Sequence, residues 1–293
     1  MNLFNGRSVI GNKKRRRLRY RALRDRMFLG LFIVAVMAGI TGLITLLATV
    51  IVDAWGWVDW QFITSYASRF PDKSGIFAPL MGTVWIIGTT IIFTIPIGVG
   101  TAIFLEEFSD GNKLSKLIQI NISNLAGVPS IVYGILGLGV FVMLIGLGRS
   151  VLAGGLTLSL LVMPIVIIAS QEAIRAVPSG YRDAAYAMGA TRWQVVKSVV
   201  MPEAIPGIMS GIILAISRAI GEAAPILMIS GIVYITFVPN NVSSSFTVLP
   251  LQIMTWATLP QADFQSIAAA AILVLLVVLL TLNASAIWIR NKF

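Results

Sequence analysis

The sequence predicts an all-α integral membrane protein with six transmembrane helices, and three observations lead to that prediction. Hydrophobic residues make up 57% of the 293 residues, and only 12% are charged. Runs of about 20 apolar residues, the length that crosses a bilayer, recur along the chain. Lysine and arginine gather on one predicted side of the membrane. One membrane domain with short loops and tails accounts for all three observations.

The six predicted spans are stretches with few or no ionisable side chains. The fifth contains Arg218 and Glu222, and the other five contain none. The first apolar run is too long for the apolar core of a signal peptide, and no small-residue cleavage site follows it cleanly, so we expect an uncleaved span. The predicted spans are residues 27–52, 79–105, 125–147, 151–169, 208–238 and 267–289.

The distribution of basic residues orients these spans. If the N-terminus is cytoplasmic, the inside segments hold 18 lysines and arginines, whereas the outside segments hold only Arg69, Lys73 and Arg149. This bias follows the positive-inside rule and places both termini in the cytoplasm. Residues 1–26 form a basic tail, which resembles a nucleic-acid patch in composition. Because the tail precedes a first span, we expect it to contact anionic lipid headgroups instead.

Composition also excludes several kinds of chemistry. The chain has no cysteine and no histidine, so disulfides, thiol nucleophiles, ordinary zinc sites and histidine acid–base catalysis are excluded. We expect no metal site and no cofactor bound by this chain. The chain also lacks the G-x-x-x-x-G-K-[ST] phosphate loop, so it supplies no ATP site of this kind.

Residues 181–206, between the fourth and fifth spans, are unusually polar for this chain. Pro178 and Ser179 can begin a helix there. Gly189 fits the position just past a helix end, where the backbone favours a left-handed conformation. An apolar stripe on the predicted first helix consists of Tyr181, Ala184, Ala185 and Met188.

A second short helix is predicted directly after this bend. Thr191 and Gln194 match a capping box that would begin it, and Pro202 is expected to end it. The residues expected to share one face of this helix are Trp193, Val196 and Val200. The periodicity fits either an element lying on lipid headgroups or a helix that docks in the groove of a cytoplasmic partner.

Arg218 and Glu222 form the second notable pattern. Arg218 lies ten residues into the fifth predicted span, about 15 Å deep at 1.5 Å per residue. An ionisable residue at such a depth costs about 2.5–3.5 kcal/mol on insertion scales. Glu222 is four residues later and can pair with it. The pair is either a structural ion pair between packed helices or a site for an anion, which the planar guanidinium suits.

Small residues recur every fourth position beside this pair. They permit another helix to approach closely, and ordinary helix packing explains them. We therefore expect the adjacent row of Leu214, Arg218 and Glu222 to abut a subunit or pathway interface rather than lipid. The small residues are Gly207, Gly211, Ala215, Ala219 and Ala223.

The polar segment resembles the EAA loop of ABC-importer membrane subunits, with the pattern E-A-A, three residues, G, nine residues, I-x-L-P. The spacings are intact, with Asp for Glu, Val for Ile and Met for Leu. The matching residues are Asp183, Ala184, Ala185, Gly189, Val199, Met201 and Pro202. The resemblance implies a type I (MetI-like) permease fold in residues 27–293, with the coupling loop over residues 171–207.

The same resemblance implies that the first short helix docks in a cleft of a partner ATPase, which hydrolyses ATP with Mg²⁺. Small Ala184 and Ala185 would permit close approach, while Arg182 and Asp183 would fix the register. The residues expected to couple to the ATPase are Tyr181, Arg182, Asp183, Ala184, Ala185, Met188, Gly189 and Pro202.

Three further stretches resemble PstA-type permeases of phosphate importers: "GVPSIVYG" at 127–134, "SRAIGEAAPI" at 217–226 and "LPLQIMTWAT" at 249–258. This resemblance covers the chain from about residue 76 onward. It implies that Arg218 takes part in phosphate transport, with Glu222 as its partner residue. It also implies a non-catalytic subunit in the plasma membrane of a bacterium or archaeon.

The expected partners are a dimer of a PstB-type ATPase, a PstC-type second permease and a PstS-type extracytoplasmic phosphate-binding protein. Transport would proceed by alternating access, and residues 239–265, which lack lysine and arginine, would form an outside loop. The alternatives are a PstC-type, sulfate or molybdate permease, and an ion-coupled secondary transporter that uses Arg218 and Glu222 as a relay. A membrane-anchored protein that binds nucleic acid through its tail is a further alternative, although we expect no nucleic-acid partner.

Overall fold

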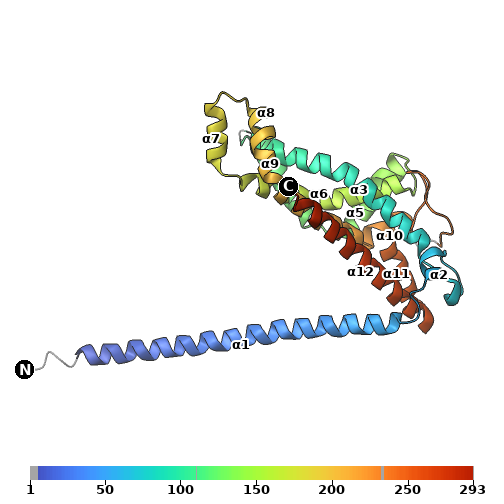
Figure 1. The fold of residues 1–293 in the computed structure, drawn as a ribbon, viewed down its shortest axis with the longest axis horizontal. Helices are drawn as coiled ribbons and strands as arrows, with labels where there is room; N and C mark the ends of the chain where they lie inside the picture. Colours follow the sequence, from blue (N-terminus) through green and yellow to red (C-terminus); the bar gives the residue numbers. More distant parts are fainter. Residues whose placement is uncertain (1–5, 110, 232–233, 293) are drawn as a thin grey trace, which may run out of the picture. The chain divides into compact units, whose positions relative to one another are not determined.

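The computed structural model describes residues 6–109, 111–231 and 234–292, and all regular structure in those ranges is helical (Figure 1). The chain divides into two compact units, residues 1–52 and 53–293. The first unit consists of most of α1 (Gly6–Ala54), a continuous helix that contains the first predicted span. Five described helices are long and apolar enough to cross a membrane, and a bent pair makes a sixth. The all-α, six-span prediction is confirmed.

The second unit contains the remaining helices. The long ones are α3, α6, α9 and α12, and three short π-helical turns extend α3, α5 and α8. The bounds are α2 (Trp60–Thr64), α3 (Phe77–Ile103), α4 (Lys113–Ala126), α5 (Ser130–Gly137), α6 (Val151–Arg175), α7 (Ser179–Ala187), α8 (Arg192–Val195), α9 (Met201–Gly221), α10 (Ala224–Ser230), α11 (Leu249–Ala257) and α12 (Ala262–Arg290), with π-helical turns at Phe104–Phe108, Leu138–Leu144 and Val196–Val200 and one 3₁₀ turn at Pro71–Lys73.

Local capping explains where several of these helices begin. The side chain of Asn112 accepts a hydrogen bond from the backbone N–H of Ser115 at 2.9 Å, at the start of α4. Ser150 accepts from the N–H of Ala153 at 3.3 Å, at the start of α6. Each cap satisfies an N–H group that has no partner inside the helix. These caps therefore place the ends of the spans.

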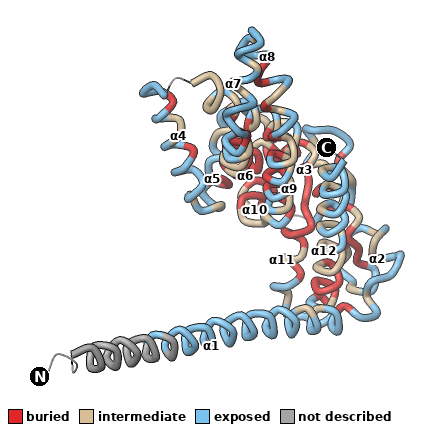
Figure 2. Tube along the Cα trace, turned by 60° about the vertical axis from the view of Figure 1, so that its left-hand side comes forward, coloured by how far each residue is buried: buried red, intermediate tan, exposed pale blue. Residues whose placement is uncertain are grey.

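Close packing of α3 against α6 forms the centre of the second unit, and Figure 2 shows the buried residues concentrated there. A Cβ atom at Gly155 of α6 would lie 2.5 Å from Cγ2 of Thr89, and one at Gly98 of α3 would lie 2.9 Å from Cγ1 of Val166. Small residues at these crossings let the two backbones approach, which is how helices associate within membranes.

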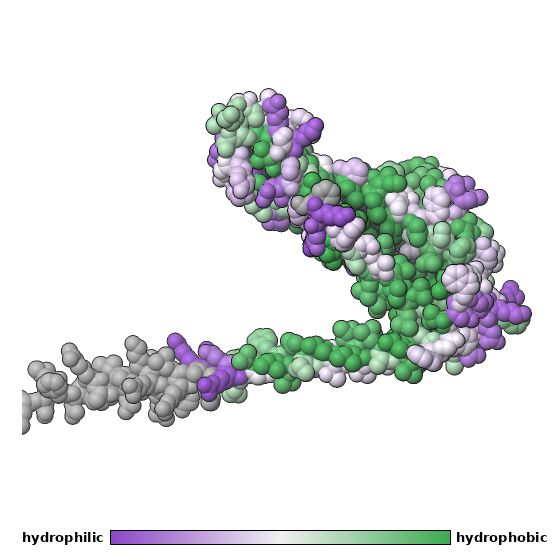
Figure 3. All heavy atoms as spheres, in the orientation of Figure 1, coloured by the Kyte–Doolittle hydropathy of each residue, from purple (hydrophilic) through white to green (hydrophobic). Residues whose placement is uncertain are grey.

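Hydrophilic atoms gather around α7 and α8 at one end of this unit and around α2 at the other, with hydrophobic surface between (Figure 3).

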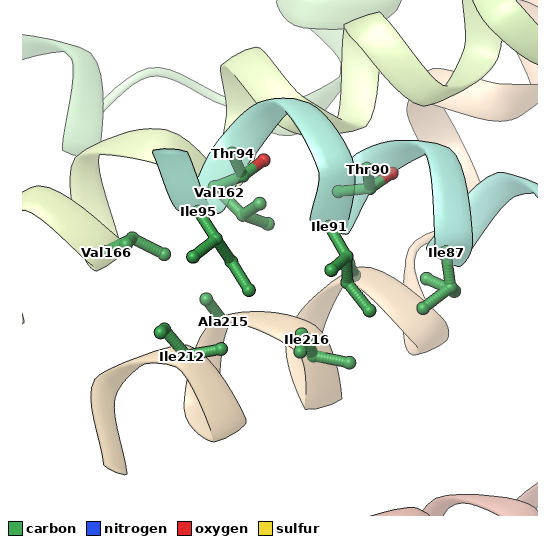
Figure 4. A pocket seen from close by; sticks show the side chains of 11 residues that line it. Ile87, Thr90, Ile91, Thr94, Ile95, Val162, Val166, Ile212, Ala215 and Ile216 are labelled. Atoms are coloured by element: carbon green, nitrogen blue, oxygen red, sulfur yellow. The ribbon is translucent and has the colours of Figure 1, made fainter. Parts of the chain in front are cut away.

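A small void remains where α3, α6 and α9 meet, with room of about 10 Å³ (Figure 4). Thr94 contributes a buried hydroxyl without a hydrogen-bond partner among the described residues. Its other walls are apolar or already bonded, so the void could hold about one water molecule at most. The lining residues are Ile87, Thr90, Ile91, Thr94, Ile95, Val162, Val166, Ile212, Ala215, Ile216 and Ala219.

Two of the predicted spans follow a different path in the structure, while the other four differ only in where they begin or end. The third begins in α4, and α4 meets the segment Ser130–Leu144 at a bend of 107°. Pro129 caps α5 at this bend and has no N–H to continue the α4 ladder. The fifth begins at Arg192 and ends at Gly221 rather than at residue 238. Short α10 follows it after a break, so the apolar run 208–238 is not one helix.

The expected outside loop, residues 239–265, is only partly a loop. Within it, α11 is packed into the unit, with Leu249 and Trp256 buried. The N–H of Leu249 donates to the Thr83 hydroxyl of α3 at 3.0 Å. The prediction of a loop was therefore wrong for α11 and for the start of α12 at Ala262, whereas the outside position of residues 239–265 stays a prediction.

Candidate functional site

The polar segment after α6 folds as the sequence predicts over its first part. Pro178 caps α7, and Gly189 has a φ of +81°. Thr191 and Gln194 form the capping box at the start of α8. The two helices stand side by side at one end of the unit (Figure 1). The helix–bend–helix prediction is therefore confirmed.

The second helix does not end at Pro202, which corrects the sequence prediction. A helical path runs from Arg192 to Gly221, and Pro202 lies in the first turn of α9. The turn before it is π-helical, with the N–H of Met201 donating to the carbonyl of Val196. A wider turn absorbs the missing N–H and the bulk of the proline ring, so the helix continues.

The predicted shared face of the second helix is only partly correct. Val196 and Val200 are buried, but Trp193 is exposed. The Trp193 ring lies 6.3 Å from that of Phe108, centroid to centroid. Trp193 is therefore not part of the buried face formed by Val196 and Val200.

The apolar stripe of α7 is largely uncovered. Tyr181 and Ala184 are exposed, and Met188 is 88% exposed. Beside it lies an open hollow of about 490 Å³. An exposed apolar stripe next to a hollow is the surface expected of a docking element. The hollow is lined by Ala185, Met188, Gly189, Ala190, Gln194, Ser198 and Val199.

Arg182 does not share that surface. Its guanidinium turns toward its own chain, where Nη2 lies 2.9 Å from Oε1 of Glu107. It also donates to the carbonyl oxygens of Val177 at 2.7 Å and Ile174 at 2.8 Å. Asp183, by contrast, is exposed. Of the two residues expected to fix register on an ATPase, only Asp183 faces outward.

A second polar cluster lies beside this contact, where the C-terminal ends of α3 and α6 meet the middle of α4. Arg175 donates two hydrogen bonds to the Glu106 carboxylate, from Nε at 2.8 Å and from Nη2 at 2.7 Å. The amide of buried Gln171 donates to the same carboxylate at 2.7 Å and to Gln119 of α4 at 2.9 Å. Sequence reasoning missed these residues. The available signal was the acidic pair in "FLEEF" at the end of an apolar run.

The expected pairing of Arg218 with Glu222 is present. Nε of Arg218 donates to Oε1 of Glu222 at 3.2 Å. The helix ends between the two residues, at Gly221, and Glu222 has an extended backbone. Arg218 thus lies in the last turn of α9, where a cation also interacts favourably with the negative end of the helix dipole.

The position of Arg218 along the bundle can be read from its level on α6, because α6 packs along α9. A Cβ atom at Gly211 would lie 2.3 Å from Cβ of Ala169, and Ala219 lines the same void as Val162. Val162 is close to the middle of α6. Arg218, next to Ala219 in sequence, therefore lies level with the middle of that helix, and α9 ends at that level.

The surroundings of Arg218 separate a packed face from an open one. Ala215 and Ala219 are buried, whereas Leu214 and Arg218 are exposed. α9 therefore packs on the unit through the face of Ala215 and Ala219 and leaves the face of Leu214 and Arg218 open.

Among the side chains that the structure describes, no group of three or more Asp, Glu, His or Cys residues could hold a metal ion.

Comparison with known proteins identifies relatives along most of the chain. The model of the family described as "binding-protein-dependent transport system inner membrane component" matches residues 94–292. The probable ABC transporter permease protein YqgI of Bacillus subtilis (strain 168) is 32% identical over 283 residues, covering 92% of this chain and 96% of YqgI. The phosphate transport system permease protein PstA 1 of Mycobacterium tuberculosis (strain ATCC 25618 / H37Rv) is 34% identical over 271 residues, covering 88% of this chain and 85% of PstA 1.

Solved structures share the fold. A chain of a bacterial ABC transporter involved in the import of the acidic polysaccharide alginate superposes with a TM-score of 0.67 at 15% identity, covering 94% of this chain and 99% of that one. A chain of the MetNI methionine ABC transporter, in inward-facing conformations, gives a TM-score of 0.60 at 18% identity, covering 74% of this chain and 96% of that one. The predicted MetI-like fold is thereby confirmed, and the chain belongs to the family of binding-protein-dependent transport system inner membrane components.

Proposed function

We propose that the chain is a membrane-spanning permease subunit of an ATP-driven importer that moves inorganic phosphate into the cytoplasm by alternating access. Support comes from the 34% identity to a permease named for phosphate transport over 88% of this chain. A permease of this kind is not an enzyme. ATP and Mg²⁺ would be used by a separate ATPase subunit.

The observation that carries this proposal is Arg218 at the end of α9. Within the described residues it donates one hydrogen bond, from Nε, and its side chain is 47% exposed. Both terminal Nη groups are therefore available to an oxyanion, which a guanidinium can bind through two parallel hydrogen bonds. Broken helices whose ends lie inside the bundle form the substrate sites of many transporters. Glu222 would orient the guanidinium and be displaced, in part, by the anion.

Uptake of radiolabelled phosphate by cells or proteoliposomes that contain the full complex tests this role. We expect Arg218→Gln to lower uptake by at least about 100-fold, the scale of losing a preorganised donor to an anion. Copurification of the other subunits should not change. Arg149→Gln, at an exposed arginine just before the start of α6, is the matched control. Normal uptake with Arg218→Gln would show that this residue is not part of the pathway. If excess unlabelled sulfate abolished uptake of labelled phosphate by the unchanged complex, the substrate would be reassigned.

The second part of the proposal concerns α7 as the docking element for the ATPase dimer. The exposed stripe of Tyr181, Ala184 and Met188 and the adjacent hollow support it. Gly189 permits the sharp bend after α7 because its φ is positive, a conformation that costs other residues strain. Asp183, exposed on the same helix, would add a polar contact. Pro202 would act only through the path of α9.

Copurification tests the docking role directly. Ala185→Asp places a charge in the hollow, and we expect it to lower recovery of the ATPase with a tagged chain by at least about tenfold. Ala187→Asp makes the same change on another face of α7 and serves as the control. Equal recovery of the ATPase with both variants would contradict docking through this surface.

The remaining partners follow from the family and from the open face of α9. Leu214 and Arg218 would face a second, PstC-type permease across the pathway, and a PstS-type binding protein would deliver phosphate from outside. The basic tail, residues 1–26, would contact anionic lipid at the inner surface, with residues 27–293 forming the permease domain. Both termini would then be cytoplasmic in a multi-pass protein of the plasma membrane.

A further inference from the structure

Arg182 connects three helices through one side chain. Its Nε and Nη2 both donate to Oε1 of Glu107, at 3.2 and 2.9 Å, which ties α7 to the π-helical turn that ends α3. Nη1 and Nη2 donate to the carbonyls of Val177 and Ile174, just past and within the last turns of α6. A planar guanidinium fixes the direction of each of these bonds.

Burial makes this contact tight. The side chain of Arg182 is 20% exposed and that of Glu107 only 8% exposed. The two carbonyls belong to the C-terminal end of α6, where backbone acceptors have no partner inside the helix. Arg182 therefore supplies a donor to the Val177 carbonyl and a second donor to the Ile174 carbonyl, which also accepts from the N–H of Val177 at 3.3 Å. A movement of α7 would have to break these bonds or carry α3 and α6 with it.

Glu106, the residue before Glu107, also bonds to another helix, in this case α6. Glu106 binds Arg175 and Gln171 of α6, and Gln171 reaches Gln119 of α4. Adjacent carboxylates at the end of α3 thus hold α7 and α6 separately. Single π-helical turns of this kind often occur at functional sites.

We propose that Arg182 and Glu107 form the joint that transmits movement of α7 to α3 and α6, so that Arg182 is a positioning residue and not a contact to the ATPase. This inference rests on the proposed docking of α7. If the joint is loosened, the ATPase still binds and hydrolyses ATP, but the spans no longer follow. The measurable consequence is fewer phosphate ions moved per ATP hydrolysed.

The absence of cysteine in the sequence permits a reversible test. The double variant Glu107→Cys/Arg182→Cys is assembled into the complex, reconstituted in proteoliposomes and supplied with ATP and the phosphate-binding protein. We expect uptake per ATP to fall by about tenfold, within the range of broken coupling elements. Bridging the two thiols with a short bis-methanethiosulfonate should restore the ratio, and dithiothreitol should abolish it again. The unmodified complex treated with the same reagents controls for effects on other subunits.

Two results would overturn the inference. One is an unchanged ratio of uptake to hydrolysis in the unbridged double variant, and the other is a lowered ratio that bridging does not restore. Glu107→Gln is the second variant, since it removes the charge with little change of shape, and the same lowered ratio is expected from it. Recovery of the ATPase with Ala185→Asp reports on docking independently, so failure of the joint and failure of the docking proposal are distinguishable.

Discussion

Arg182 and Arg218 both pair with a glutamate, at 2.9 and 3.2 Å, but the side chain of Arg182 is 20% exposed and that of Arg218 is 47% exposed. Their glutamates differ in the same direction, with Glu107 8% and Glu222 17% exposed. Arg182 donates to three acceptors of its own chain. Arg218 donates to one among the described residues.

The difference separates an arginine that holds structure from one that is available to a ligand. Each nitrogen of the Arg182 guanidinium donates to a protein oxygen, which leaves little for a substrate or a partner. Arg218 has no hydrogen bond from its Nη groups within the described residues. We propose that these groups are kept for the transported anion, since an ionisable group at the depth predicted from the sequence costs about 2.5–3.5 kcal/mol.

The largest expected effect concerns stability at the buried pair. Arg182→Ala leaves Glu107 without its charge partner and the Val177 carbonyl without the donor that Arg182 supplies. We expect a loss of about 3 kcal/mol, as is typical when one member of a buried pair is removed. Thermal unfolding of the purified complex, followed by loss of the monodisperse peak in size exclusion, measures it. Arg218→Ala in the same assay should leave the midpoint nearly unchanged, and an equal drop in both would erase the contrast between the two pairs.

The second expected effect concerns transport at the open pair. Arg218→Lys retains the charge but replaces a planar fork with a point charge, so bidentate contact with an oxyanion is lost. We expect phosphate uptake to fall by about tenfold, less than with Arg218→Gln. Initial uptake rates over a range of phosphate concentrations measure it. If lysine works as well as arginine, the site attracts anions by charge alone.

A third effect tests whether the packing of α9 on α6 positions Arg218. Gly211→Ala would place a methyl group 2.3 Å from Cβ of Ala169, so α9 must shift, at a cost of about 1–3 kcal/mol. Uptake should fall because Arg218 lies two turns further along α9. Adding Ala169→Gly moves the methyl group across the interface without adding volume, and this double variant should recover uptake. Failure of the second change to rescue the first would show that the loss has another origin.

These contrasts also show which parts of the molecule the sequence could predict. The bend between α7 and α8 depends on Pro178, Gly189 and the Thr191–Gln194 capping box, and these signals act within a few residues. Each was therefore visible in the sequence. The pairing of Arg218 with Glu222 spans four residues and was visible for the same reason.

The joint at Arg182 was not visible because its partners are distant in sequence. Glu107 is 75 residues away, and Glu106 is 69 residues from Arg175. Periodicity reports which face of a helix is apolar, but it does not report which helix ends meet. The error at Pro202 has a different origin. A π-helical turn let the helix continue, and a rule for regular α-helices does not include that case.

The smallest expected effect concerns the hydroxyl of Thr94, which neither ties helices together as Arg182 does nor faces the proposed pathway as Arg218 does. Thr94 buries a hydroxyl with no hydrogen-bond partner among the described residues, against a void too small for more than one water. Thr94→Val keeps the shape and removes the orphan group, so stability should be unchanged or rise by about 1 kcal/mol. Thr83→Val on the same helix is the control, since the Thr83 hydroxyl accepts from the N–H of Leu249 and donates to the carbonyl of Pro79. Thermal unfolding should therefore separate the two valine variants, with only Thr83→Val losing stability. A clear loss with Thr94→Val would mean that a water in the void bonds to the Thr94 hydroxyl, and that this group too has a structural role.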